Sequence, residues 1–222
     1  MKNFDKPDVF VYGMTGSGKD TISDYIKAYY EYRKMRIAGT IKQAICEKHD
    51  LTHEELEELK RQNPDFRMEH HTFSDLLGCP AASLNRTHQI ASRRAYDFNI
   101  VLDPEKPVVI SDVRSFDEAT ILLNNDFVGI FLARTTDEFK HAAHYTENNM
   151  FMNGQLGELS NNHNAEQMIV IFNGGSFDES AIDTIKETLH PDTKVYVMDE
   201  NPTGEDLIEF FDNILEELQL VK

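Results

Sequence analysis

Short apolar runs alternate along this chain with segments in which apolar residues recur every three or four positions. The runs have the length of buried strands, and the periodic segments have the pattern of helices with one apolar face. Elements that alternate in this way are typical of βαβ units around a parallel sheet. The pattern therefore predicts an α/β fold in which helices cover a parallel sheet.

The apolar runs give the predicted strands, at residues 8–12, 35–38, 107–111, 127–133, 167–172 and 194–198. The periodic segments give the predicted helices, at residues 41–48, 53–61, 84–99 and 116–123, in a short stretch beyond 135, and at 177–189 and 204–218. A further helix is predicted to begin near Lys19, with Ile22, Tyr25, Ile26 and Tyr29 on its apolar face. Several helix starts carry a capping box, in which a Ser or Thr precedes a Glu by three residues: Thr52 with Glu55, Ser115 with Glu118, and Ser176 with Glu179.

Residues 145–164 interrupt this pattern. They are rich in Asn, Met, Gly and His and show little apolar periodicity. We therefore expect a long loop there, and loops of that length inside a compact domain are usually functional or disordered.

A glycine-rich loop follows the first predicted strand and precedes the first helix. Its spacing is Gly13-x4-Gly18-Lys19, in the strand–loop–helix context that a phosphate-binding loop requires. Glycines let backbone N–H groups turn inward, the helix N-terminus adds partial positive charge, and the lysine reaches the β- and γ-phosphates. The alternative is a turn whose lysine is merely solvated. We expect the loop to bind a nucleoside triphosphate through Gly13, Thr15, Gly16, Ser17, Gly18 and Lys19.

The two residues after the lysine depart from the standard motif. Asp20 stands where a Ser or Thr hydroxyl normally ligates Mg²⁺, and the hydroxyl comes one residue later, at Thr21. Thr21, Asp20 or a water must therefore take that role. The Gly-Lys-x-Thr arrangement resembles nucleoside monophosphate kinases more than GTPases or large ATPases.

Polar residues stand at the carboxyl ends of two predicted strands, where ligands of open α/β sheets bind. Asp112 and Arg114 follow the strand at 107–111, and Arg134 follows the strand at 127–133. We expect Asp112 to hold Mg²⁺, Arg114 to clamp an acceptor phosphate, and Arg134 to close onto the transferred phosphate. The alternative is that Asp112 caps a helix and both arginines are surface charges.

A second group of arginines lies on the predicted helix at 84–99. Arg86 and Arg93 share one face of it, and Arg94 lies close by. They are candidates to bind the acceptor, and equally they are candidates for solvated side chains.

Composition limits the class of protein. A chain of 222 residues with 40 % hydrophobic and 27 % charged residues fits one soluble globular domain. Apolar runs too short for a bilayer and the lack of a secretory signal predict a cytoplasmic protein with no membrane contact. Two cysteines, Cys46 and Cys79, predict reduced thiols. The formal net charge of −17 argues against duplex nucleic acid as a partner, although a pocket of a few cations can still capture a small anion.

Taken in order, the motifs of this chain resemble those of the deoxynucleoside monophosphate kinases of tailed bacteriophages, which are P-loop kinases related to adenylate kinase and the animal-type phosphomevalonate kinases. The matching segments spread over roughly residues 8 to 190 and are Gly13-x5-Lys19-Asp20-Thr21, Ile37-Ala38-Gly39-Thr40-Ile41-Lys42, Val109-Ile110-Ser111-Asp112-Val113-Arg114, Arg134, His144-Tyr145-Thr146-Glu147, and Val170-Ile171-Phe172-Asn173-Gly174-Gly175-Ser176.

The resemblance implies the P-loop NTPase fold, a three-layer α/β/α sandwich with a mainly parallel five-stranded sheet, to which this chain would add a C-terminal strand and helix. It implies a single P-loop kinase domain over residues 1–222, with an acceptor-binding region at 39–100 and a lid-like insertion at 135–165. Residues 191–222 are not expected from the family, and they leave room for an extra edge element or a homodimer contact.

The resemblance also implies ATP and Mg²⁺, with a deoxynucleoside monophosphate as the phosphoryl acceptor. Lys42 falls in the acceptor-binding segment, and Asn173 falls near the loop on the adenine side. Arg114 and Arg134 fall where the family has phosphate-binding arginines. Other acceptors stay open, namely a hydroxymethyl base in phage DNA or a non-nucleotide phosphate, and so does a nucleotide-binding protein with a degenerate site.

Overall fold

The computed structural model describes residues 6–13, 17–36, 46–47, 49–63, 106–113, 116–133, 154–173, 179–198 and 204–217. The chain divides into two compact units, one made of Met1–Met35 with Leu102–Lys222 and the other of Arg36–Val101. The second unit has nearly the bounds of the acceptor-binding region expected at 39–100, and that role stays a prediction.

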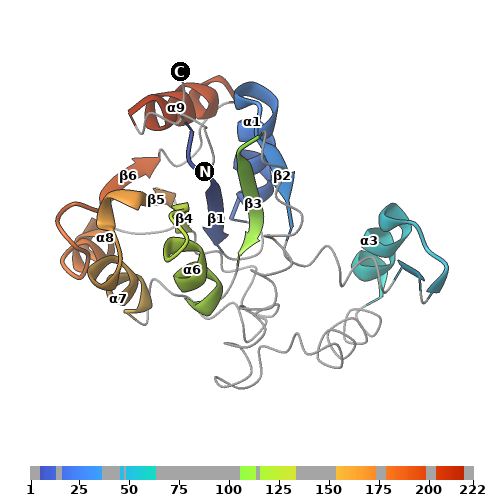
Figure 1. Cartoon of the computed structure of the whole chain (residues 1–222), viewed down its shortest axis with the longest axis horizontal. Helices are drawn as coiled ribbons and strands as arrows, with labels where there is room; N and C mark the ends of the chain where they lie inside the picture. The colour runs from blue at the N-terminus through green and yellow to red at the C-terminus, as the bar shows by residue number, and fades with distance from the viewer. Residues whose placement is uncertain are drawn as a thin grey trace. The chain divides into compact units, whose positions relative to one another are not determined.

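A six-stranded parallel sheet forms the centre of the first unit (Figure 1). Its strands are β1 (Val9–Gly13), β2 (Arg33–Met35), β3 (Val108–Val113), β4 (Val128–Ala133), β5 (Met168–Asn173) and β6 (Lys194–Met198). Their order is β2-β3-β1-β4-β5-β6, and every neighbouring pair is parallel. The predicted parallel α/β fold, extended by a C-terminal strand, is confirmed.

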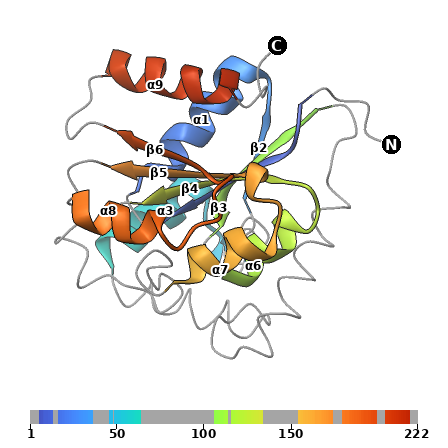
Figure 2. The same cartoon turned by 90° about the vertical axis from the view of Figure 1, so that its left-hand side faces the viewer.

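Helices cover both faces of this sheet, as Figure 2 shows. α1 (Lys19–Tyr30) and α9 (Gly204–Glu217) lie on one side, and α6 (Phe116–Leu123), α7 (Gln155–Asn162) and α8 (Glu179–Lys186) lie on the other. The first unit is therefore the expected three-layer sandwich.

The face under α1 and α9 is filled by alternate strand residues, because successive side chains of a strand point to opposite faces. Val9 and Val11 of β1 belong to this core, together with Ile22 and Ile26, which lie one turn apart on α1. Tyr29 was expected on the same apolar face, but it is 64 % exposed, so this part of the prediction is wrong.

α9 completes this core. Phe211, Ile214 and Leu215 are buried against the strands and α1, and Tyr196 and Met198 of β6 pack at the margin. The C-terminal addition thus supplies β6, which is an edge strand of the sheet, and α9, which covers one of its faces.

The opposite face carries the larger aromatic side chains. Phe10 and Phe131 are fully buried and meet edge to face, with ring centroids 5.6 Å apart. Gly129 lies between them, where a Cβ atom would fall within 2.7 Å of the Phe131 ring. The glycine makes room for the two rings in the layer beneath α6 and α7.

α7 corrects the sequence analysis, which predicted a loop over residues 145–164. Leu156 and Leu159 of this helix are buried, and Gly157 approaches so closely that a Cβ atom would lie 2.9 Å from the Thr188 carbonyl oxygen. The Asn161 side chain donates a hydrogen bond to the same carbonyl, at 3.0 Å. Two leucines among Gly, Ser and Asn give little periodicity, so packing rather than propensity stabilises this helix. The rest of the expected lid, residues 135–153, lies outside the described residues.

The boundaries of two strands also differ from those expected. β2 begins two residues before the predicted strand at 35–38, and β3 continues two residues past the expected end at Ser111, so that Asp112 lies within the strand. None of the described helices is long and apolar enough to cross a membrane.

In the second unit, α3 (His53–Gln62) has the predicted capping box. The Glu55 amide donates to the Thr52 hydroxyl at 3.2 Å, and the Thr52 amide donates to the Glu55 carboxylate at 2.8 Å. The bond from the Thr52 amide and a second one from the Thr52 hydroxyl, also 2.8 Å long, stabilise the charged carboxylate and lower the pKa of Glu55. The helices predicted at 41–48 and 84–99 lie largely or wholly outside the described residues.

Candidate functional site

The candidate site is the junction where β1 ends and α1 begins. β1 ends at Gly13 and α1 begins at Lys19, with Gly18 as the N-cap residue in a left-handed conformation, φ 96°. A residue with a Cβ adopts that conformation only at a cost, so the position requires glycine. No side chain caps the helix, which leaves its first backbone N–H groups directed toward the loop.

Gly13 allows the loop to fold tightly against the sheet. A Cβ atom there would fall under 3.0 Å from the Ser17 hydroxyl and 3.0 Å from the Leu132 carbonyl oxygen of β4. The second contact is to backbone, which cannot rotate away. The first glycine of the motif is therefore required by the close approach of β1, the loop and β4.

Lys19 directs its ammonium group back toward the end of β1. Its Nζ donates to the Gly13 carbonyl oxygen at 2.6 Å, and the residue is only 7 % exposed. The Ser23 hydroxyl donates to the Lys19 carbonyl oxygen at 2.7 Å, which fastens the first turn of α1. Because a buried ammonium needs anionic or polar partners, the loop places a cation where an anion can bind.

Two of the four buried hydroxyl groups that have no hydrogen-bond partner in the described part of the chain lie near this junction. They belong to Ser17, in the loop, and to Ser111, near the end of β3. Buried polar groups nearly always have a partner, so an unsatisfied hydroxyl in the loop fits a ligand that brings acceptor oxygens. Together with the uncapped start of α1 and the Lys19 ammonium group, the described part of the loop fits a polyphosphate.

The carboxyl end of β3 is irregular next to this loop. Phe10 pairs with Ile110 but Tyr12 pairs with Val113, so β3 contains one residue more than β1 over this interval. The extra residue falls within Ser111 and Asp112 and interrupts the regular pairing of β1 with β3, as a β-bulge does. Half-buried Asp112 lies one residue before the end of β3, at the carboxyl-terminal end of the sheet where Gly13 ends β1, and its role in the site stays a prediction.

The two residues after the lysine lie on the surface of α1. Thr21 is exposed, and the carboxylate of Asp20 forms an ion pair with Lys34 Nζ at 2.7 Å. Among the described residues, no group of three His, Cys, Asp or Glu side chains is placed to hold a metal ion. Thr21 and Asp112 as Mg²⁺ ligands stay predictions.

Several predicted site residues lie outside the described part of the chain. Asn173 ends β5 at the same edge of the sheet, but only its backbone is described. The others that the structure does not describe are Thr15, Gly16, Lys42, Arg86, Arg93, Arg114 and Arg134. The structure thus brings together Gly13, Ser17, Gly18 and Lys19, with Asp112 at the same edge.

Comparison with known proteins adds little. No protein-family model matches the sequence, and no curated protein matches it. Shikimate kinase from Acinetobacter baumannii, solved in complex with shikimate, is similar over 97 % of this chain and 96 % of that chain, with a TM-score of 0.43 and 12 % sequence identity. A likeness of this degree carries no argument about substrate or mechanism. The sheet topology and the loop define the class by themselves, a three-layer α/β protein with a P-loop motif between β1 and α1.

Proposed function

We propose that this chain is an ATP-dependent phosphotransferase and that its acceptor is a deoxynucleoside monophosphate. The observation that carries the proposal is the Lys19 ammonium group, which is buried at the junction of β1 and α1 and directed at the backbone of the glycine-rich loop. A lysine in that position serves the β- and γ-phosphates of a nucleoside triphosphate.

The described residues have separate tasks in this reaction. Lys19 and the backbone N–H groups of the loop bind and orient the triphosphate, and Gly13 allows the loop to fold closely against β4. The Ser17 hydroxyl, which has no partner in the described part of the chain, is available to donate to a phosphate oxygen. ATP would supply the phosphoryl group, and Asp112 and Thr21 would hold a Mg²⁺ ion that offsets the charge of its phosphates.

The acceptor side rests on the resemblance to the phage enzymes. Arg114 and Arg134 would fix the two reacting phosphates, and Lys42, Arg86 and Arg93 would hold the monophosphate. An acceptor phosphate is already an anion at neutral pH, so the reaction requires no strong general base. Catalysis would then come from alignment and from cations around a transition state with dispersed charge.

Replacement of Lys19 tests the phosphotransferase itself. Phosphoryl transfer measured by coupled ADP release should fall by at least about a hundredfold in Lys19→Ala, because a preorganised cation at the transferred group is lost. Lys27→Ala is the matched control, since Lys27 lies on the same helix and is exposed. Lys19→Ala with the activity of the wild type would refute the assigned role.

A screen of acceptors tests the finer part of the proposal. We expect turnover with at least one of the four deoxynucleoside monophosphates and none with hydroxymethyluracil DNA or phosphomevalonate. Turnover with one of the latter two would keep the phosphotransferase and change its acceptor. Binding of ATP without turnover on any of them would favour a nucleotide-binding protein with a degenerate site.

A further inference from the structure

Lys34 makes an ion pair that no sequence motif indicates. It lies on the edge strand β2, and its Nζ is 2.7 Å from Asp20 Oδ1 and 3.0 Å from Asp24 Oδ1. The Lys34 side chain is only 11 % exposed, whereas those of Asp20 and Asp24 are 65 % and 63 % exposed. One largely buried cation therefore serves two exposed carboxylates that lie one turn apart on α1.

Because of this ion pair, the side chains of the neighbouring residues Lys19 and Asp20 point toward different strands. Lys19 donates to Gly13 at the end of β1, whereas Asp20 is bonded to β2, which is separated from β1 by β3 in the sheet. The positive charge of Lys19 and the negative charge of Asp20 thus lie near different strands, although the two residues are adjacent in the first turn of α1.

The separation matters because a triphosphate and a carboxylate repel each other. Asp20 follows the phosphate-binding lysine directly, and an acidic residue in the first turn suits the helix dipole but opposes a polyanion bound at the same helix end. A cation that fixes the carboxylate elsewhere and offsets its charge reduces that repulsion.

We propose that Lys34 is a positioning residue for nucleotide binding, which holds the Asp20 carboxylate toward the edge of the sheet so that a triphosphate can occupy the loop beside Lys19. This inference rests on the proposed function, and it adds a residue that does not touch the nucleotide and affects its binding only through Asp20. An ordinary exposed salt bridge contributes little to stability, so the effect belongs in ligand affinity.

The test uses the two aspartates as internal controls, since both contact Lys34 but only Asp20 adjoins Lys19. The dissociation constant of MgATP is measured by calorimetric titration, without an acceptor, for Lys34→Met, for Asp20→Asn, and for Lys34→Met combined with Asp20→Asn or with Asp24→Asn. We expect Lys34→Met to weaken binding about tenfold at low salt and less at high salt, since exposed charges are screened. Asp20→Asn should restore most of the affinity, and Asp24→Asn should not.

Steady-state kinetics and a conservative variant separate positioning from a loss of fold. In Lys34→Met the KM for ATP should rise while kcat changes little, and Lys34→Arg should retain most of the affinity because it keeps the charge. Urea denaturation establishes that each variant is folded, and Lys34→Gln replaces Lys34→Met if the latter does not fold.

Three results would overturn the inference. One is unchanged MgATP affinity in folded Lys34→Met, and another is equal rescue by Asp20→Asn and Asp24→Asn. The third is a loss of Mg²⁺-dependent binding in Asp20→Asn alone, which would make Asp20 a metal ligand. A wild-type chain that binds no ATP would overturn the proposed function and this inference together, whereas the first three results leave the proposed function standing.

Discussion

At the scale of single residues, the close approach at Gly13 gives a direct prediction. In Gly13→Ala the new methyl group meets the Ser17 side chain and the Leu132 carbonyl oxygen, so the loop must shift away from β4. We expect MgATP affinity to fall by about tenfold or more, because the loop donors lose their alignment. Calorimetric titration measures the loss, and circular dichroism checks the fold.

The double variant Gly13→Ala with Ser17→Gly is the informative companion. It removes the side-chain contact and leaves the backbone contact with Leu132, so its affinity should stay below that of Ser17→Gly alone, which lacks the same hydroxyl. Equal affinity in Gly13→Ala and in the wild type would contradict this explanation of the glycine.

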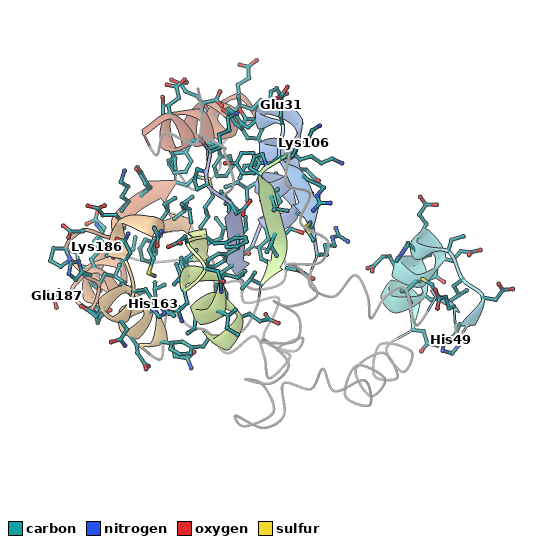
Figure 3. The ribbon with its side chains drawn as sticks, viewed as in Figure 1. Glu31, His49, Lys106, His163, Lys186 and Glu187 are labelled. Atoms are coloured by element: carbon teal, nitrogen blue, oxygen red, sulfur yellow. The ribbon has the colours of Figure 1, made fainter. Side chains whose placement is uncertain are left out.

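Glu31 supplies a stability prediction at the same scale. It ends α1 in a left-handed conformation, φ 63°, at an exposed position, and Figure 3 labels it there. A side chain with a Cβ is strained in that conformation, and a carboxylate at a helix C-terminus opposes the helix dipole. Glu31→Gly should raise the free energy of unfolding by about 1 kcal/mol in urea denaturation. Glu31→Ala removes only the charge and should gain less, and an equal gain in both would refute the backbone explanation.

The sequence was sufficient for some of these residues and not for others. Gly13 and Lys19 could be predicted because they belong to one short motif, and because the strand before it and the helix after it show in the adjacent sequence. The register shift between β1 and β3 near Ser111 could not, since it exists only once the two strands pair. Lys34 was missed for a similar reason, because its partners belong to another element.

At the scale of elements, α9 tests how much the C-terminal addition contributes to the first unit. Ile214 is 2 % exposed in the core beneath the helix, and Ile208 on the same helix is 41 % exposed. Ile214→Ala should lower the free energy of unfolding by about 3 kcal/mol, because it leaves a cavity. Ile208→Ala should change it by about 0.5 kcal/mol or less. Equal effects in urea denaturation would show that α9 is not part of the cooperative core.

A pair of phenol groups fastens α9 to α1. Tyr25 donates to Asp212 Oδ1 at 2.5 Å, and Tyr30 donates to the same oxygen. Burial first, and then the hydrogen bond to Asp212, raise the pKa of Tyr25 from 10.0 to about 12. A raised pKa means that the folded state holds the proton more tightly, so this contribution is complete below pH 10 and is lost as the pH rises toward 12.

Thermal unfolding followed between pH 9 and pH 12 should therefore show a falling midpoint over the upper part of that range, about pH 10 to 12. Tyr25→Phe should be less stable at pH 8 but lose less between pH 10 and 12, because it has no phenol proton to release. The remaining slope belongs to Tyr30 and Tyr32, whose pKa values burial also raises. An identical pH dependence in Tyr25→Phe would contradict the assignment.

The elements themselves show where sequence patterns lose information. β4 and β5 were predicted to within one residue at each end, because continuous apolar runs identify buried strands of a parallel sheet. The amphipathic pattern of α9 identified its apolar face but not what that face packs on. α7 was not predicted because Leu156 and Leu159 are the only larger apolar residues on its buried face. Gly157 contributes by having no side chain, which lets the helix approach the Thr188 carbonyl closely.

At the scale of the whole molecule, charge decides between acceptors. The chain carries a formal net charge of −17, which repels a polyanion such as DNA along the whole length of the DNA in contact with the protein. A mononucleotide is small, so it experiences mainly the local field of the site. We therefore expect no retardation of duplex DNA, with or without hydroxymethyluracil, at about 50 mM salt, where electrostatic binding is strongest. MgATP should bind under the same conditions, which shows that the protein is active in the assay. Retardation that weakens steeply as salt rises would reveal a local basic groove, and it would move the acceptor from a free monophosphate to a base within DNA.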